Sequence, residues 1–147
     1  MKKLFVVMTI GGLLALSLVA SAQAQMPGVP VRASIPFAFM VRGKTLPAGN
    51  YEIERVTDDP SGLLLRNVNN KHEHLVFETE SMEGKRIPGH SVLVFNRYGD
   101  DYFLSEVVTA GDQTGRELAP SHAERTLRRE LTAQNQTEPE TVMVALY

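Results

Sequence analysis

The sequence contains no cysteine and no tryptophan. Without cysteine the chain has no disulfide framework, no thiolate metal site and no cysteine nucleophile. An excess of charge of one sign is also lacking, since 15 basic residues stand against 17 acidic ones and the formal net charge is −2. This balance excludes a strongly basic nucleic-acid-binding domain and a polyelectrolyte tail. The length of 147 residues corresponds to one domain.

Long hydrophobic runs are scarce as well, apart from one at residues 4–20. This run follows Met1-Lys2-Lys3 and is followed by small residues that include Ala22 and Ala24. A positive start, an apolar stretch and a small-x-small site are typical of a secretory signal peptide. The run is also shorter than the roughly 20 residues that a membrane-spanning helix needs. We predict that residues 1–24 are a signal peptide that is cleaved after Ala24, or after Ala22.

Cleavage would leave an acidic mature chain, residues 25–147, that is secreted or periplasmic. Because no cysteine follows the signal, we do not expect a lipid-anchored lipoprotein. We also expect the mature chain not to span the membrane after cleavage. The strands predicted at residues 51–56 and 63–68 are shorter than the about 9–11 residues of a membrane-spanning strand.

The start of the mature chain alternates between apolar and other residues. Every odd position from 29 to 41 is apolar, and a period of two predicts a β-strand. Pro30 and Pro36 have no N–H for a ladder hydrogen bond, so this strand must lie at an edge or bend at Pro36.

Further short strands, separated by turn residues, are predicted along the next 70 or so positions. They lie at residues 51–56, 63–68, 72–81, 91–98 and 102–109. Strands at a spacing of about 8–12 residues predict a mainly β fold. We expect residues 25–147 to form a single antiparallel β-sandwich or small β-barrel of about 7–8 strands.

One helix is predicted near the C-terminus, over residues 121–134. Ser121 and Glu124 have the spacing of a capping box, in which each side chain reaches the other's backbone amide. Ala123, Leu127 and Leu131 then form a narrow apolar stripe. Residues 141–147 are predicted as a final strand, either buried on both faces or paired beside the first strand.

Three segments carry a resemblance to known proteins. The first is IPFAF at 35–39 with GKTLPAGxY at 43–51, and the others are RYGDDYFLSE at 97–106 and TGREL at 114–118. Together they look like a family of small secreted bacterial proteins of unassigned function. The resemblance implies export and a mostly β fold, and it brings no activity, cofactor or catalytic residue to this chain.

His72 and His74 are the weak candidates for a metal site. Two residues apart on a predicted strand, their rings would point to the same face. A zinc site needs a third ligand and usually a fourth, and nothing in the sequence spacing recruits one. We therefore expect a polar, solvent-facing strand at this position, with no metal and no cofactor.

The other polar candidates have ordinary structural explanations. Glu52 and Glu54 share one strand face, as the two carboxylates of a glycoside hydrolase share a cleft. They alternate with Tyr51 and Ile53, however, which is the pattern of a solvated strand face. The basic cluster on the predicted helix consists of His122, Arg125, Arg128 and Arg129. Acidic neighbours are interleaved with it, which favours a solvated helix face over an anion site.

The sequence shows no nucleophile elbow, P-loop or dinucleotide-binding fingerprint, so we predict that the protein is not an enzyme. We expect a non-catalytic envelope or extracellular module that binds a protein, a glycan or a surface, and no nucleic acid. The loops at 42–50, 82–90 and 110–119 are the expected binding regions. The alternative is a carrier of a small apolar ligand in a lipocalin-like barrel cavity. The phenylalanines that could instead fill such an interior are Phe37, Phe39, Phe77, Phe95 and Phe103.

Overall fold

The computed structural model describes residues 30–147 except 57, 60, 84–88, 111–113 and 135–137. The predicted signal peptide, with its cleavage positions at Ala22 and Ala24, lies outside the described residues. Within them the chain forms eleven strands, β1 to β11, and one helix, α1 (His122–Ala133), which precedes the last strand. The predicted mainly β fold with one C-terminal helix and a final strand is therefore confirmed. No helix among the described residues is long and apolar enough to cross a membrane.

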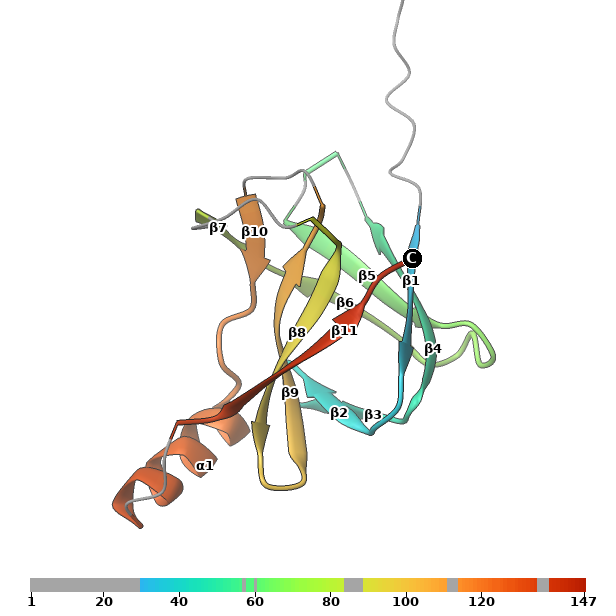
Figure 1. The fold of residues 1–147 in the computed structure, drawn as a ribbon. Helices are drawn as coiled ribbons and strands as arrows, with labels where there is room; N and C mark the ends of the chain where they lie inside the picture. The colour runs from blue at the N-terminus through green and yellow to red at the C-terminus, as the bar shows by residue number, and fades with distance from the viewer. Residues whose placement is uncertain (1–29, 57, 60, 84–88, 111–113, 135–137) are drawn as a thin grey trace, which may run out of the picture.

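The strands form two sheets (Figure 1). The first sheet has the spatial order β1 (Val31–Ile35), β4 (Gly49–Arg55), β5 (Gly62–Asn67), β6 (His74–Glu78). The path of the second sheet is β11 (Glu140–Ala145), β8 (Val92–Tyr98), β9 (Asp101–Val108), β10 (Thr114–Glu117), β7 (Glu80–Glu83). Two short strands lie off this path, β2 (Phe39–Val41) and β3 (Lys44–Leu46).

The two sheets do not close into a barrel. β11 meets β1 only with its C-terminal end, where Ala33 and Leu146 form an isolated bridge, and Figure 1 shows the two strands diverging from there. Of the two architectures that the sequence left open, the structure therefore has the sandwich. The barrel alternative was wrong because only the last residues of β11 reach β1.

Aromatic and aliphatic side chains from both sheets fill the space between them. Phe37 stacks on Tyr102 with ring centroids 3.9 Å apart, and its edge meets Phe95 at 5.2 Å. Phe39 packs edge-on against Tyr51 at 5.3 Å and against Phe95 at 5.5 Å. Rings thus occupy the interior where the carrier hypothesis would place a ligand. Edge-to-face pairs also fix the relative position of the two sheets.

The predicted strand at residues 29–41 is interrupted at Pro36. The structure ends β1 at Ile35 and begins β2 at Phe39, which pairs with the second sheet through Met40 and Phe103. The chain thus bends at Pro36, which was one of the two alternatives predicted from the sequence. The alternation persists across it, since Ala33, Ile35, Phe39 and Val41 are all buried. Pro36 cannot donate a ladder hydrogen bond, so the chain changes sheets at this position.

The predicted strand at residues 72–81 starts two residues later and is divided in two. Thr79 separates β6 from β7, and both its amide and its hydroxyl donate to the carbonyl of Ser61, each at 2.9 Å. β7 then pairs with β10 in the second sheet. At the buried Thr79 the chain therefore passes from the first sheet to the second. The alternation of apolar and polar residues in the sequence does not indicate this change of sheet.

The expected loop at residues 110–119 contains a strand. Thr114–Glu117 forms β10, which pairs antiparallel with both β7 and β9. This part of the loop prediction was wrong because the pairing partners come from distant parts of the chain. A short polar segment becomes a strand when two neighbours satisfy its backbone. The expected loop at residues 42–50 likewise contains β3, which pairs with β2, and these divisions raise the number of described strands above the predicted 7–8.

The helix agrees closely with its prediction. Its N-cap is Ser121, whose hydroxyl accepts from the amide of Glu124 at 3.1 Å, and its C-cap is Gln134. The second half of the predicted capping box is absent, because the Glu124 side chain turns toward β8 instead of the cap. The final strand β11 pairs with β8 along its length, and its end reaches β1. It is exposed on one face and not buried on both.

Candidate functional site

The structure separates the two histidines that the sequence placed on one strand face. His72 lies in the turn before β6, where its amide donates to the Asn70 side chain at 3.2 Å. His74 is the first residue of β6, and its Nδ1 lies 3.3 Å from the carbonyl oxygen of Lys71. Both side chains are exposed. In the part of the chain that the structure describes, no group of three or more His, Cys, Asp or Glu side chains is placed to hold a metal ion.

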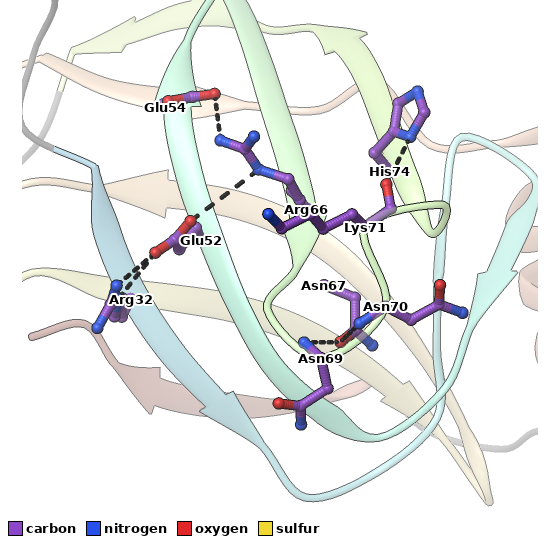
Figure 2. A network of polar contacts seen from close by, with 9 residues as sticks. All are labelled: Arg32, Glu52, Glu54, Arg66, Asn67, Asn69, Asn70, Lys71 and His74. Carbon is purple, nitrogen blue, oxygen red and sulfur yellow. Dashed lines mark hydrogen bonds and ion pairs between the residues drawn. The ribbon is translucent and has the colours of Figure 1, made fainter.

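Asn67 shapes the turn that moves His72 off the strand. Its buried side-chain oxygen accepts from the amides of Asn69 at 2.9 Å and Asn70 at 3.1 Å (Figure 2). Its side-chain nitrogen donates to Glu73 at 3.1 Å. Such local bonds stabilise a turn in competition with the β ladder. The strand therefore begins only at His74.

Glu52 and Glu54 are held in a ladder of alternating charge on the outer face of the first sheet. Arg32 donates to Glu52 at 2.6 Å, and Arg66 donates to Glu54 at 2.7 Å (Figure 2). The Nε of Arg66 has no hydrogen-bond partner and lies 4.0 Å from a Glu52 oxygen. Each carboxylate is thus neutralised by a guanidinium. This pairing favours a structural role over a pair of catalytic carboxylates.

Several hollows lie beside the helix, which projects from one end of the sandwich (Figure 1). Two of them adjoin each other and share Tyr98, Leu131, Glu138 and Pro139; we call them together the α1 groove. Their volumes are about 410 and 670 Å³. The larger is completed by Asn96, Arg128 and Thr132, and the smaller by Arg97, Gly99, Leu127 and Glu140. The lining of the groove thus combines apolar side chains with charged ones.

A buried carboxylate holds the helix beside this groove. Glu124 is only 3% exposed and accepts from the side-chain amide of Asn96 at 3.0 Å and from the hydroxyl of Tyr98 at 3.4 Å. Arg128 donates to the same hydroxyl at 3.3 Å, and this hydrogen bond is the main cause that raises the pKa of Arg128. Arg128 is therefore a permanent cation at the groove. The sequence marked Glu124 as a cap residue, and nothing in its spacing indicated the partners on β8.

The apolar stripe of the helix is only partly covered. Leu127 and Leu131 are half-buried, and Ala123 is exposed. The basic residues predicted beside the stripe fall into two places. Arg128 lines the α1 groove, whereas His122 and Arg125 line a separate hollow of about 550 Å³ with Arg42 at the start of the helix. The basic cluster is thus divided between two sides of α1.

Comparisons with known proteins give no further assignment: no family model, no curated protein and no solved structure matches this chain.

Proposed function

We propose that the protein is an exported, non-catalytic β-domain that binds a segment of another protein in the α1 groove. The observation that carries this proposal is that Leu127 and Leu131, both half-buried, line the α1 groove. Leu131 lines both of its hollows, of about 410 and 670 Å³, and Leu127 lines the smaller one. An amphipathic helix normally buries its apolar stripe completely against its own domain. A stripe that stays half-covered beside a hollow supports binding of an added apolar side chain.

The charge at the groove indicates the chemistry of the partner. Arg128 lines the larger hollow, and Arg129 is exposed on the same helix. Glu138 lines both hollows and Glu140 lines the smaller one, where Glu140 is paired with Arg97 at 3.1 Å. The apolar anchor of a bound segment would contact Leu127 and Leu131, and an adjacent acidic residue would pair with the N–H groups of Arg128 that do not bind Tyr98. An acidic amphipathic peptide is the occupant that fits best.

The rigid part of the site is the sheet, and the helix is attached to it through Glu124. Asn96 and Tyr98 belong to β8, which lies between β9 and β11 in the second sheet. A site on a paired strand keeps its geometry when a ligand binds. The partner would thus meet a preformed surface, which reduces the ordering that binding requires.

Export is the second half of the proposal, and it rests on the N-terminal sequence. Expression of the full chain in a bacterial host, followed by cell fractionation and mass spectrometry, tests it. We expect the periplasm or medium to contain a chain that starts at Gln25, or at Gln23 if cleavage follows Ala22. A Leu14→Arg variant is the control, since a charge in the apolar run should prevent export. A full-length wild-type chain that stays in the cytoplasm would contradict the proposal.

Binding is tested with defined probes and the exported protein in NMR titrations. The first probe is a short peptide of leucine and glutamate, and the second is its counterpart with lysine in place of glutamate. We expect the acidic peptide alone to shift the amide signals of α1 and β8. Leu131→Glu should abolish the shifts, whereas Val76→Glu, at an exposed valine of the other sheet, should leave them unchanged.

Two further probes distinguish the other classes of partner. The third probe is an oligosaccharide mixture and the fourth is anionic phospholipid vesicles. If one of these shifts the signals of the groove and the acidic peptide does not, the partner is a glycan or a membrane surface and not a protein. If none of the four probes moves the signals of α1 and β8, the groove is not the binding site and the proposed function fails.

A further inference from the structure

A hollow separate from the α1 groove gathers positive charge from two distant parts of the chain. We call it the basic hollow, and its volume is about 550 Å³. Arg42 lines it from the turn between β2 and β3, whereas His122 and Arg125 line it from the first turn of α1. The other lining residues carry no charge, and they are Gly43, Pro120, Ser121 and Ala123. The tertiary structure thus adds a third basic side chain to two that the helix sequence already placed together.

The basic side chains of this hollow have no carboxylate partner in the described part of the chain. The ion pairs of that part involve other arginines, which are Arg32, Arg66 and Arg97. Glu124 lies between His122 and Arg125 in the sequence, but its side chain is buried and turned toward Asn96 on β8. The guanidinium groups of Arg42 and Arg125 are therefore permanent cations without a counter-charge, which a bound anion would supply.

Several hydrogen-bond donors at the basic hollow are free to bind a ligand. Arg125 donates one N–H group to the carbonyl of Pro120, which holds its guanidinium at the start of the helix. The Ser121 hydroxyl accepts from the Glu124 amide at 3.1 Å, and its own proton has no acceptor among the described residues. The Arg42 side chain makes no hydrogen bond to any described residue. Two guanidinium groups and one hydroxyl can thus donate to the same ligand.

Arg42 occupies a backbone position that does not suit an arginine. The turn between β2 and β3 has two residues, Arg42 with a φ of 51° and Gly43 with a φ of 88°. Asparagine, aspartate or glycine is the usual first residue of such a turn, because most side chains disfavour a positive φ. The Arg42 side chain is exposed, so no packing contact offsets this strain. An arginine kept at a strained position without an internal contact supports a role in binding.

We propose that the basic hollow binds a phosphate group, to which Arg42 donates from the β2–β3 turn and Arg125 from the helix. A single guanidinium can pair with both oxygens of a carboxylate. Donors on two separate elements suit a phosphate group better, because its oxygens point in several directions. A volume of about 550 Å³ also leaves room for the organic part of a phosphate ester. The ligand is therefore a small phosphate ester or the headgroup of a phospholipid.

Two probes test the site and distinguish these sources of the phosphate group: inorganic phosphate and vesicles of phosphatidylglycerol. In NMR titrations of the exported protein, sodium chloride keeps the ionic strength constant. We expect inorganic phosphate to cause saturable shifts of the amide signals of Gly43, His122 and Ala123, and no shifts on β8. If the protein also sediments with the vesicles, the source is a lipid headgroup, and if it does not, the source is a small ester. Shifts that stay linear up to about 50 mM phosphate would overturn the proposal, because they would show charge screening alone.

The Arg42→Asn variant separates binding from folding. Asparagine suits a positive φ better than arginine, so the variant should unfold at a temperature no lower than that of the wild-type protein. Its affinity for phosphate should fall at least about tenfold, because a charged hydrogen-bond donor is lost. Arg55→Asn is the matched control, since it removes the same charge at an exposed position of β4 and should change the affinity less than about twofold. Equal losses of affinity in the two variants, or wild-type affinity in Arg42→Asn, would overturn the proposal.

Discussion

The carboxylate of Glu124 accepts a hydrogen bond of 3.0 Å from the side-chain amide of Asn96, which joins the only described helix to the middle of a β-strand. Glu124 is the one buried residue of α1, so this polar contact takes the place that a leucine usually has in helix packing. Tyr98 donates to the same oxygen at 3.4 Å. The attachment of the helix is thus hydrogen-bonded at its first turn and apolar only farther along.

Replacing Glu124 should therefore destabilise the protein. We expect Glu124→Ala to lower the free energy of unfolding by about 1–3 kcal/mol, because the Asn96 amide and the Tyr98 hydroxyl lose their acceptor. Urea denaturation followed by circular dichroism measures this change. Glu130→Ala, at an exposed position of the same helix, is the control and should change stability by less than about 0.5 kcal/mol. Equal losses in the two variants would show that the contact does not anchor α1.

Two glutamates that face each other predict a pH dependence. Glu106 lies opposite Glu117 in the β9–β10 pair, and burial, followed by the charge of Glu117, raises the pKa of Glu106. A raised pKa means that the folded protein holds the proton more tightly than the unfolded chain does. The stability that Glu106 contributes is fully present below its ordinary value of 4.5 and is lost as the pH rises through the raised value.

We expect the Glu106→Gln variant to avoid this loss of stability at high pH. We expect it to stabilise the protein by up to about 1 kcal/mol at neutral pH, since like charges directly opposite in a sheet are unfavourable. Urea denaturation at a series of pH values should show the gain shrinking as the pH falls toward the ordinary value of a glutamate. Glu117→Gln should have a similar effect, and the double variant should gain less than the sum. A gain that is constant with pH would contradict this account.

Asn67 provides a prediction about the turn between β5 and β6. Asn67→Ala should cost about 1–3 kcal/mol, because the amides of Asn69 and Asn70 lose their buried acceptor. Asn67→Asp keeps an acceptor but sets a second carboxylate against Glu73, so its stability should fall as the pH rises above about 5. Thermal unfolding at two pH values distinguishes the two effects. Asn69→Ala, at an exposed position, serves as the control.

The ion pairs on the outer face of the first sheet should contribute little to the stability of the protein. Arg32 and Glu52 are 2.6 Å apart, but the Arg32 side chain is 56% exposed, and solvent screens such pairs. A double-mutant cycle with Arg32→Ala and Glu52→Ala should give a coupling energy below about 1 kcal/mol, and added salt should reduce it. Coupling that is larger, or that salt leaves unchanged, would contradict a solvent-screened pair.

Local patterns in the sequence were sufficient for the elements that depend on their own residues. The helix has the predicted bounds because Ser121 caps it, and capping depends on residues within one turn. The alternation in residues 31–41 predicted which side chains face the core, since a strand exposes every second residue whatever its neighbours are. Pro36 similarly marked the bend, because proline removes a ladder donor at any position.

The contacts between distant residues could not be predicted in this way. β10 is a strand only because β7 and β9 lie on either side of it, and Glu124 points to β8 only because the sandwich places Asn96 beneath the helix. The α1 groove was missed for the same reason, as its lining comes from three elements. The sequence of α1 did contain one signal, since an apolar stripe of two leucines is narrow for a fully packed helix.

The order of amino acids alone is enough to establish that the chain forms strands, where its helix begins and that disulfides and thiolate sites are absent. These properties follow from residue type and short-range spacing, which need no partner. The packing of distant segments was needed to establish that the two sheets form a sandwich and not a closed barrel, and that an acidic side chain is buried under the helix. Both depend on which distant backbone and side-chain groups satisfy one another's hydrogen bonds, and a one-dimensional pattern does not contain that pairing.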